Sequence, residues 1–363
     1  MNIFFILIAL YIGGNIYIFF RGKAALSAFP KRVKAACLIF QCLAVLSTFI
    51  SFFFRDVAFP LWFTRLIYSF GNGWLVFTLY MVLLLAVTDI IGIFRKFRYG
   101  FFVSLLLTFS ILAYGYYKYW NPVKEEIDIT IGKPLKNGLA SLKIVALSDL
   151  HLGSGSYKNW LQQRVDEIND CKPDLILIGG DLIDNSLVPV RNTVLEDIVN
   201  RLQAPMGIYA VPGNHEYFSN VDECKKWMDE NTPIRMLRDE VVTLPCGLQI
   251  VGRDDRQNRR RLPLERVVEQ VNDTLPTVLL DHQPSDLGVA ARNNIDLQFS
   301  GHTHHGQIWP LTLLTDRLFE LSYGFRKIGN TCYYVSSGLG LWGPPFRIGT
   351  QSEFVVFNIS FKE

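Results

Sequence analysis

The sequence predicts a multi-pass α-helical membrane bundle followed by an α/β domain. The chain has 363 residues, of which 50% are hydrophobic, and the apolar excess lies almost entirely in the first third. The remainder alternates short apolar runs with amphipathic segments, the pattern of successive strands and helices in α/β proteins. The formal net charge is only +3, which gives no case for a nucleic-acid partner.

Four apolar stretches in the first third are long enough to span a bilayer. They occupy residues 1–20, 33–54, 66–90 and 99–120. Each has about the 20 residues needed to cross a hydrocarbon core about 30 Å thick. No Lys or Arg precedes the apolar body of the first stretch, which argues against a cleavable signal peptide. We therefore expect four transmembrane helices within residues 1–120.

The charges between these stretches predict an orientation. Two loops are basic and hold Arg21, Lys23, Lys31, Arg32 and Lys34, and Arg95, Lys96 and Arg98. The loop between them holds only Arg55, Asp56 and Arg65. Basic loops stay in the cytoplasm by the positive-inside rule. We therefore expect an integral protein of the cytoplasmic membrane whose segment after Trp120 is extracytoplasmic.

Residues 121–141 mark the change from the bundle to the second domain. They are polar and contain Pro and Gly, but residues 127–131 alternate like a strand. This segment is either a linker or a lead-in strand of the next sheet. We expect the α/β domain itself to occupy residues 142–363.

Polar loops follow five apolar runs of the second domain. The runs are residues 144–147, 175–178, 208–211, 277–280 and 295–299. All six histidines of the chain lie in the loops after them: His151, His215, His282, His302, His304 and His305. Ligand sites of α/β sheets lie outside the carboxyl ends of the strands, so we expect these loops to converge on one crevice.

The side chains in these loops are suited to holding metal ions. The available ligands are Asp149, His151, Asp181, Asn214, His282, His302 and His304. Seven nitrogen and oxygen donors are too many for one ion but suit two ions that share a carboxylate. Imidazole and carboxylate without thiolate favour two divalent ions of Mn, Fe, Zn or Co. Paired ions of this kind activate water for attack on phosphorus.

The same loops carry a resemblance to a known family. Asp149-x-His151, Gly180-Asp181, Gly213-Asn-His-Glu216, His282 and Gly301-His302-x-His304 resemble the motifs of the calcineurin-like metallophosphoesterase superfamily. The resemblance covers about residues 142–363. The tail from Ser337 to Gly349 is similar to the membrane-anchored bacterial branch often called YkuE/YaeI-like. The resemblance implies two mixed β-sheets packed face to face, with helices on both outer sides.

The resemblance also implies a role for each site residue. One metal ion would be held by Asp149, His151, Asp181 and His304, and the other by Asp181, Asn214, His282 and His302. His215 would be the general acid that protonates the leaving oxygen. A histidine beside a ligand but left uncoordinated can donate a proton near neutral pH.

Two positions depart from the pattern of this branch. His305 stands where glycine is usual, and it either hydrogen-bonds substrate or a ligand carboxylate, or faces water. Asp281 stands where small residues are frequent, and it either orients His282 or caps a turn.

These observations predict a membrane-tethered two-metal phosphohydrolase acting on phosphate ester or diphosphate bonds. The alternatives are a non-catalytic metal-binding scaffold and a regulatory domain for the membrane bundle. The sequence identifies no protein partner.

Two further features bear on the substrate. Residues 308–321 are unusually apolar for a segment leaving an active site. They either fill the core of the domain or form an exposed apolar lip that admits lipid-linked substrates.

Arg347, in the Gly- and Pro-rich tail segment, is our candidate for binding a substrate phosphate.

Overall fold

The computed structural model describes residues 2–53, 61–95 and 97–362. The chain forms two compact units. The first contains Met1–Tyr117 and Gly343–Ile348, and the second contains Lys118–Trp342 and Gly349–Glu363. Of the charges behind the orientation prediction, Arg55, Asp56 and Lys96 lie outside the described residues.

The first unit contains the four predicted apolar helices. They are α1 (Asn2–Ala25), α2 (Lys31–Phe53), α3 (Leu61–Phe94) and α4 (Gly100–Trp120). All four are long and apolar enough to cross a membrane. Large apolar side chains such as Leu10, Ile93 and Phe94 are exposed on these helices, as expected for surfaces that face lipid.

Polar side chains inside the helical unit are hydrogen-bonded to one another. Asn15 accepts a bond of 3.0 Å from the Trp74 indole and donates one of 3.3 Å to Thr78. Asp89 lies 2.5 Å from the Arg21 guanidinium and accepts a bond from the Tyr17 hydroxyl. Such pairing avoids leaving polar groups unsatisfied in hydrocarbon.

The second unit contains two six-stranded sheets. The first has the order β1-β12-β2-β3-β4-β5 and the second the order β10-β11-β9-β8-β7-β6. Strands β2 to β5 are mutually parallel, as are β11, β9, β8 and β7, whereas β12 pairs antiparallel with β2 and β10 antiparallel with β11. The strands of the first sheet are β1 (Val123–Ile131), β2 (Ser141–Leu147), β3 (Leu175–Ile178), β4 (Ile208–Ala210), β5 (Ile234–Met236) and β12 (Glu353–Phe361). Those of the second are β6 (Glu240–Thr243), β7 (Gln249–Gly252), β8 (Thr277–Leu280), β9 (Leu297–Ser300), β10 (Gly324–Ile328) and β11 (Thr331–Val335).

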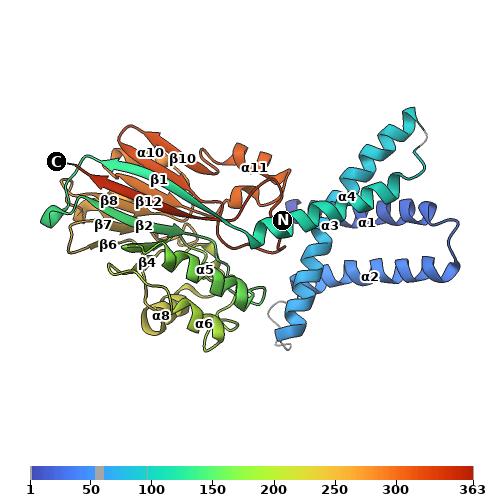
Figure 1. The fold of residues 1–363 in the computed structure, drawn as a ribbon, viewed down its shortest axis with the longest axis horizontal. Helices are drawn as coiled ribbons and strands as arrows, with labels where there is room; N and C mark the ends of the chain where they lie inside the picture. Colours follow the sequence, from blue (N-terminus) through green and yellow to red (C-terminus); the bar gives the residue numbers. More distant parts are fainter. Residues whose placement is uncertain (1, 54–60, 96, 363) are drawn as a thin grey trace. The chain divides into compact units, whose positions relative to one another are not determined.

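The helices of this unit are α5 (Lys158–Asp170), α6 (Val194–Val199), α7 (Asn214–Phe218), α8 (Val221–Asn231), α9 (Leu264–Val267), α10 (Leu287–Arg292) and α11 (Leu311–Leu318), with short 3-10 turns η1 (Lys136–Gly138), η2 (Val268–Gln270) and η3 (His304–Gly306). Residues of α5, α6 and α8 pack on the outer face of the first sheet and residues of α9 and α10 on that of the second, whereas α11 follows the turn η3 (Figure 1).

Three apolar clusters define the layers. Alternate residues of a strand point to opposite faces of its sheet. In β2, Val145 packs in a cluster with Trp160 of α5, whereas Ile144 packs in a cluster with Phe299 of the second sheet. A third cluster joins the outer face of the second sheet to α9 and α10. The predicted arrangement of two mixed sheets packed between helices is therefore confirmed.

Residues 123–131 form the edge strand β1, which pairs parallel with β12. The segment between the predicted domains therefore contains a lead-in strand of the first sheet.

A close contact within the helical unit gives a test of its packing. A Cβ added at Gly71 of α3 would lie 2.6 Å from the carbonyl oxygen of Ser47 in α2. We expect Gly71→Ala to lower the thermal unfolding temperature of the purified protein, because these two backbones must separate. Gly92→Ala in the same helix is the matched control, since nothing lies within 4 Å of its added Cβ. It should be neutral or stabilising by up to about 1 kcal/mol. Equal effects of the two variants would contradict this packing.

Candidate metal centre

The predicted ligands all lie just beyond the carboxyl ends of strands. Asp149 and His151 follow β2, Asp181 follows β3, and Asn214 begins α7 after β4. In the second sheet, His282 follows β8, and His302 and His304 follow β9. Because neighbouring strands are parallel, their carboxyl ends meet at one edge of each sheet.

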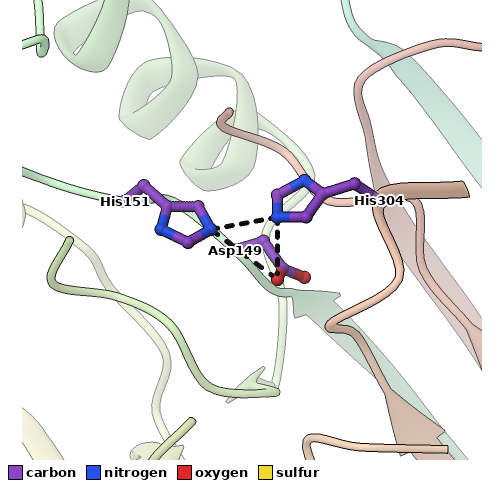
Figure 2. Close-up of side chains that lie close together, drawn as sticks. All are labelled: Asp149, His151 and His304. Atoms are coloured by element: carbon purple, nitrogen blue, oxygen red, sulfur yellow. Dashed lines mark hydrogen bonds and ion pairs between the residues drawn. The ribbon is translucent and has the colours of Figure 1, made fainter. Parts of the chain in front are cut away.

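Asp149, His151 and His304 form one buried group of possible metal ligands (Figure 2). The Nε2 atoms of His151 and His304 lie 3.0 Å apart, and His304 Nε2 lies 3.3 Å from Asp149 Oδ1. Three donors from two separate loops, one in each sheet, therefore converge on one point.

Asp181, His282 and His302 form a second group. His282 Nε2 lies 3.1 Å from Asp181 Oδ2, and His302 Nδ1 lies 2.8 Å from Asn214 Oδ1. Asp181 Oδ2 is also 3.8 Å from His151 Nε2 of the first group. One carboxylate oxygen therefore faces both groups, as expected of a carboxylate that bridges two ions.

The donors fit metal ions in their orientation as well as in their type. His282 Nδ1 lies 2.7 Å from the Gly179 carbonyl and donates to it, which turns Nε2 toward Asp181. This Nε2 is buried and has no hydrogen-bond partner among the described residues. A backbone carbonyl that fixes the tautomer in this way is typical of metal-binding histidines.

The carboxylates near the second group of possible ligands favour a positive charge on the neighbouring His282. Burial lowers the pKa of His282, but the carboxylates of Asp181 and Asp149 outweigh it and raise this pKa well above its ordinary value. Burial, aided by His282, lowers the pKa of His302 to about 3, so His302 is neutral and can act as a ligand. Burial raises the pKa of Asp181, but His282, His151 and His215 together hold it below its ordinary range.

The backbone is left-handed at five of these ligands. The φ angles of Asp149, His151, Asp181, His302 and His304 lie between 48° and 72°. Residues with a Cβ rarely adopt this conformation, and it costs of the order of 1 kcal/mol or more at each position. The surrounding packing therefore holds the ligand loops in a strained shape that turns them sharply at the strand ends.

Two glycines allow the loops to approach the carboxylates. A Cβ at Gly213 would lie 2.1 Å from Asp181 Oδ1, and one at Gly301 would lie 2.3 Å from Asp149 Oδ2. These glycines are required for space beside the ligands.

His215 lies beside the ligands but is held by another residue. Its Nδ1 lies 2.7 Å from the Asp184 carbonyl oxygen and 3.1 Å from Asp184 Oδ1. Burial lowers the pKa of His215, but Asp184 and Asp181 outweigh it, so this pKa is raised. His215 also lies within ligand range of His151 and Asp181.

Sequence reasoning assigned no role to Asp184 or Glu216. Glu216 is fully buried and accepts bonds from the backbone N–H groups of Asp181 (3.0 Å), Gly213 (2.7 Å) and Ile183 (2.8 Å). It thus ties together the loops after β3 and β4. Burial, together with Asp181, raises its pKa to about 7. Both acids follow apolar runs in the same loops as the predicted ligands, and that position is the signal that could have identified them.

The structure shows the surroundings of Asp281 and His305, the two positions that depart from the pattern of the family branch. Asp281 Oδ2 pairs with Arg261, and the buried Asp281 Oδ1 has no hydrogen-bond partner among the described residues, so this side chain makes no hydrogen bond that would cap a turn or orient His282. His305 is half-buried, stacks on Tyr323 with ring centroids 4.8 Å apart, and lies 3.5 Å from Asp316. A substrate contact by His305 stays a prediction.

Arg347 lies in the segment that belongs to the helical unit. Its side chain is fully buried, and its backbone N–H donates to the Gly115 carbonyl at 3.0 Å. Its predicted contact with phosphate stays a prediction.

The apolar segment after the His304 turn is mostly exposed. Ile308 and Leu321 are buried, but five large apolar side chains of this segment are exposed: Trp309, Leu311, Leu313, Leu314 and Leu318. These five side chains therefore do not fill the core of the domain. We call them the apolar lip.

Comparison with known proteins agrees with this site. The family model for the calcineurin-like phosphoesterase matches residues 142–306. A metallophosphoesterase of Helicobacter pylori is 34% identical over 269 residues, which cover 72% of this chain and 70% of the relative. The YkuE metallophosphoesterase of Bacillus subtilis is 30% identical over 257 residues, 68% of this chain and 90% of the relative.

A relative from Danio rerio carries the description "Transmembrane protein with metallophosphoesterase domain". It is 29% identical over 281 residues, 72% of this chain and 62% of the relative. Together with the four apolar helices, this match supports a membrane protein. The chain belongs to the calcineurin-like metallophosphoesterases, in their YkuE-like branch, and is a metal-dependent phosphoesterase with a binuclear metal centre.

Proposed function

We propose that this protein is a membrane-tethered phosphohydrolase that cleaves phosphate ester or diphosphate bonds of lipid-linked substrates. The observation that carries the proposal is the position of Asp181, whose Oδ2 faces both groups of ligands. A non-catalytic scaffold would not need this shared carboxylate together with an uncoordinated histidine, His215, beside it.

The ligands divide into two sets around Asp181. One ion would be held by Asp149, His151, Asp181 and His304, and the other by Asp181, Asn214, His282 and His302. When bound, two such ions activate a water and stabilise the charge on the attacking and leaving oxygens at phosphorus. The protein supplies rigid ligand loops, and the backbone N–H of His215 donates to Asp181 Oδ1 at 2.8 Å.

His215 is suited to be the general acid. Asp184 holds its Nδ1, so Nε2 is the nitrogen that can give a proton to the leaving oxygen. The raised pKa keeps this imidazole protonated closer to neutral pH. A positioned acid of this kind contributes about 10²–10⁴-fold to the rate.

The apolar lip supports a lipid-linked substrate. It directly follows the turn that carries His304, and its side chains are between 45% and 68% exposed. An exposed apolar surface beside a catalytic centre is typical of a contact with lipid or with an apolar ligand.

We place the protein in the cytoplasmic membrane with its α/β domain outside the cytoplasm. The support is the eight basic residues in the two loops flanking the second and third predicted spans. A reporter fused after Glu363 should give the extracytoplasmic phenotype, and a cytoplasmic phenotype would reverse this orientation.

The metal assignment predicts the effect of removing ligands. Asp181→Ala should abolish hydrolysis while the domain stays folded, because both ions lose a ligand. Elemental analysis should find two divalent ions per wild-type chain and fewer in the variant. Asp273→Ala removes an exposed acid from the same domain and should retain both ions and full activity. Full activity of a wild-type chain with one ion or none would contradict the two-ion assignment.

The role of His215 predicts a dependence on the leaving group. His215→Asn should lose about 10²–10⁴-fold in kcat on alkyl phosphate esters, whose leaving oxygen needs a proton. It should lose much less on nitrophenyl esters, which leave without one. If both classes of substrate slow by the same factor, His215 binds or positions the substrate instead.

The apolar lip predicts a selective loss on lipid substrates. The combined change Trp309→Ser, Leu313→Ser and Leu314→Ser should slow hydrolysis of a lipid phosphate in liposomes and spare a soluble phosphodiester. Val194→Ser, at an exposed position of α6, should slow neither reaction. Equal losses on both substrates, or no loss on either, would exclude a role of the lip in binding lipid.

A further inference from the structure

The helical unit contains a cavity that phosphoester hydrolysis does not use. Its volume is about 770 Å³, within the range of about 300–1,000 Å³ typical of ligand pockets. All four helices and the turn after α1 contribute to its wall. It therefore lies wholly within this unit.

The wall of this cavity is almost entirely apolar and aromatic. Trp74 stacks on Phe77 with centroids 4.5 Å apart, and Phe40 meets Trp74 edge-on at 5.7 Å. The indole N–H and the amide N–H at this wall have partners, since Trp74 donates to Asn15 and Gln41 donates to the Asn15 carbonyl at 2.8 Å. The apolar part of the wall therefore offers dispersion contacts to a hydrocarbon chain.

Two lysines are the charged side chains in the cavity wall, and no acid is among the described residues that line it. Lys23 belongs to α1 and Lys34 to α2. Lys34 donates to the Ser27 carbonyl at 2.7 Å, which leaves two of its three protons for another acceptor. Within the described part of the chain, neither lysine has a carboxylate at ion-pair distance, whereas the nearby Arg21 is paired with Asp89.

We propose that this cavity binds one anionic phospholipid, with an acyl chain against the aromatic wall and the headgroup phosphate between Lys23 and Lys34. Basic pockets between transmembrane helices are suited to anionic headgroups, and each lysine near such a headgroup contributes about 1 kcal/mol. Residues 21–34 contain five basic residues and no acid, and of these Arg21 is paired with Asp89 of α3, so the segment keeps an excess of positive charge around the headgroup. A zwitterionic lipid fits the same wall but gains less from the two lysines.

The test compares two lipids with the same acyl chains. The purified full-length protein in a nonionic detergent is titrated with dioleoyl phosphatidylglycerol or dioleoyl phosphatidylcholine, and the bound lipid is counted by native mass spectrometry. The wild type should bind the phosphatidylglycerol more tightly. Lys23→Gln with Lys34→Gln should weaken phosphatidylglycerol binding by about fivefold for each lysine and weaken phosphatidylcholine binding by a smaller factor.

A matched control separates the cavity from the general charge of the loop. Lys31→Gln with Arg32→Gln removes the same two charges from the same loop, at exposed positions outside the cavity wall. It should retain the preference for phosphatidylglycerol. Ala36→Phe, at an exposed position of the wall, should fill the cavity and weaken binding of both lipids.

Equal binding of the two lipids by the wild type would overturn the proposal. So would an equal loss in the two double variants, because the preference would then come from the loop as a whole. The two double variants test the proposed lipid site even if Ala36→Phe does not fold. Hydrolytic activity is not the readout, so the outcome is independent of the proposed function.

Discussion

The metal centre depends on burying one negative charge, the carboxylate of Asp181. An isolated buried carboxylate is strongly unfavourable unless it is paired and hydrogen-bonded. Here Oδ1 accepts the backbone N–H of His215, and Oδ2 faces His282 at 3.1 Å and His151 at 3.8 Å. Two imidazoles from different sheets therefore meet at one oxygen, and the loops of both sheets must reach it.

Other features of the fold bring the loops of both sheets together around Asp181. Parallel strands carry the loops of each sheet to one edge, and the face-to-face packing joins the sheets through their shared apolar layer. Left-handed residues turn the chain sharply after the strands, and Gly213 and Gly301 leave space beside the carboxylates. Glu216 then fixes the loops after β3 and β4 through three backbone N–H groups. The strain in the ligand loops is maintained by this fully buried surrounding structure.

Much of this arrangement could be predicted from the sequence, because it depends on local patterns. Five apolar runs of strand length predicted β2, β3, β4, β8 and β9, and the polar residues that follow them predicted which side chains would cluster. The four apolar helices were equally clear. Their limits were less clear: the third apolar stretch was predicted at residues 66–90, whereas α3 extends from Leu61 to Phe94.

The parts that could not be predicted depend on contacts between distant residues. Asp184 meets His215 across 31 residues of sequence, and Asp281 pairs with Arg261 across 20. No spacing rule connects such pairs. Whether residues 308–321 fill the core or form a surface was also open, because an amphipathic pattern does not say which partner covers its apolar face. The exposure of Leu313, Leu314 and Leu318 favours the surface.

The most direct test of the two-ion account is the position of the ions themselves. Crystals of the protein grown with Mn²⁺ should be measured by anomalous X-ray scattering near the manganese absorption edge. The account predicts two anomalous peaks about 3.5–4 Å apart, both in contact with the Asp181 carboxylate. A single peak, or two peaks of which only one contacts Asp181, would contradict it.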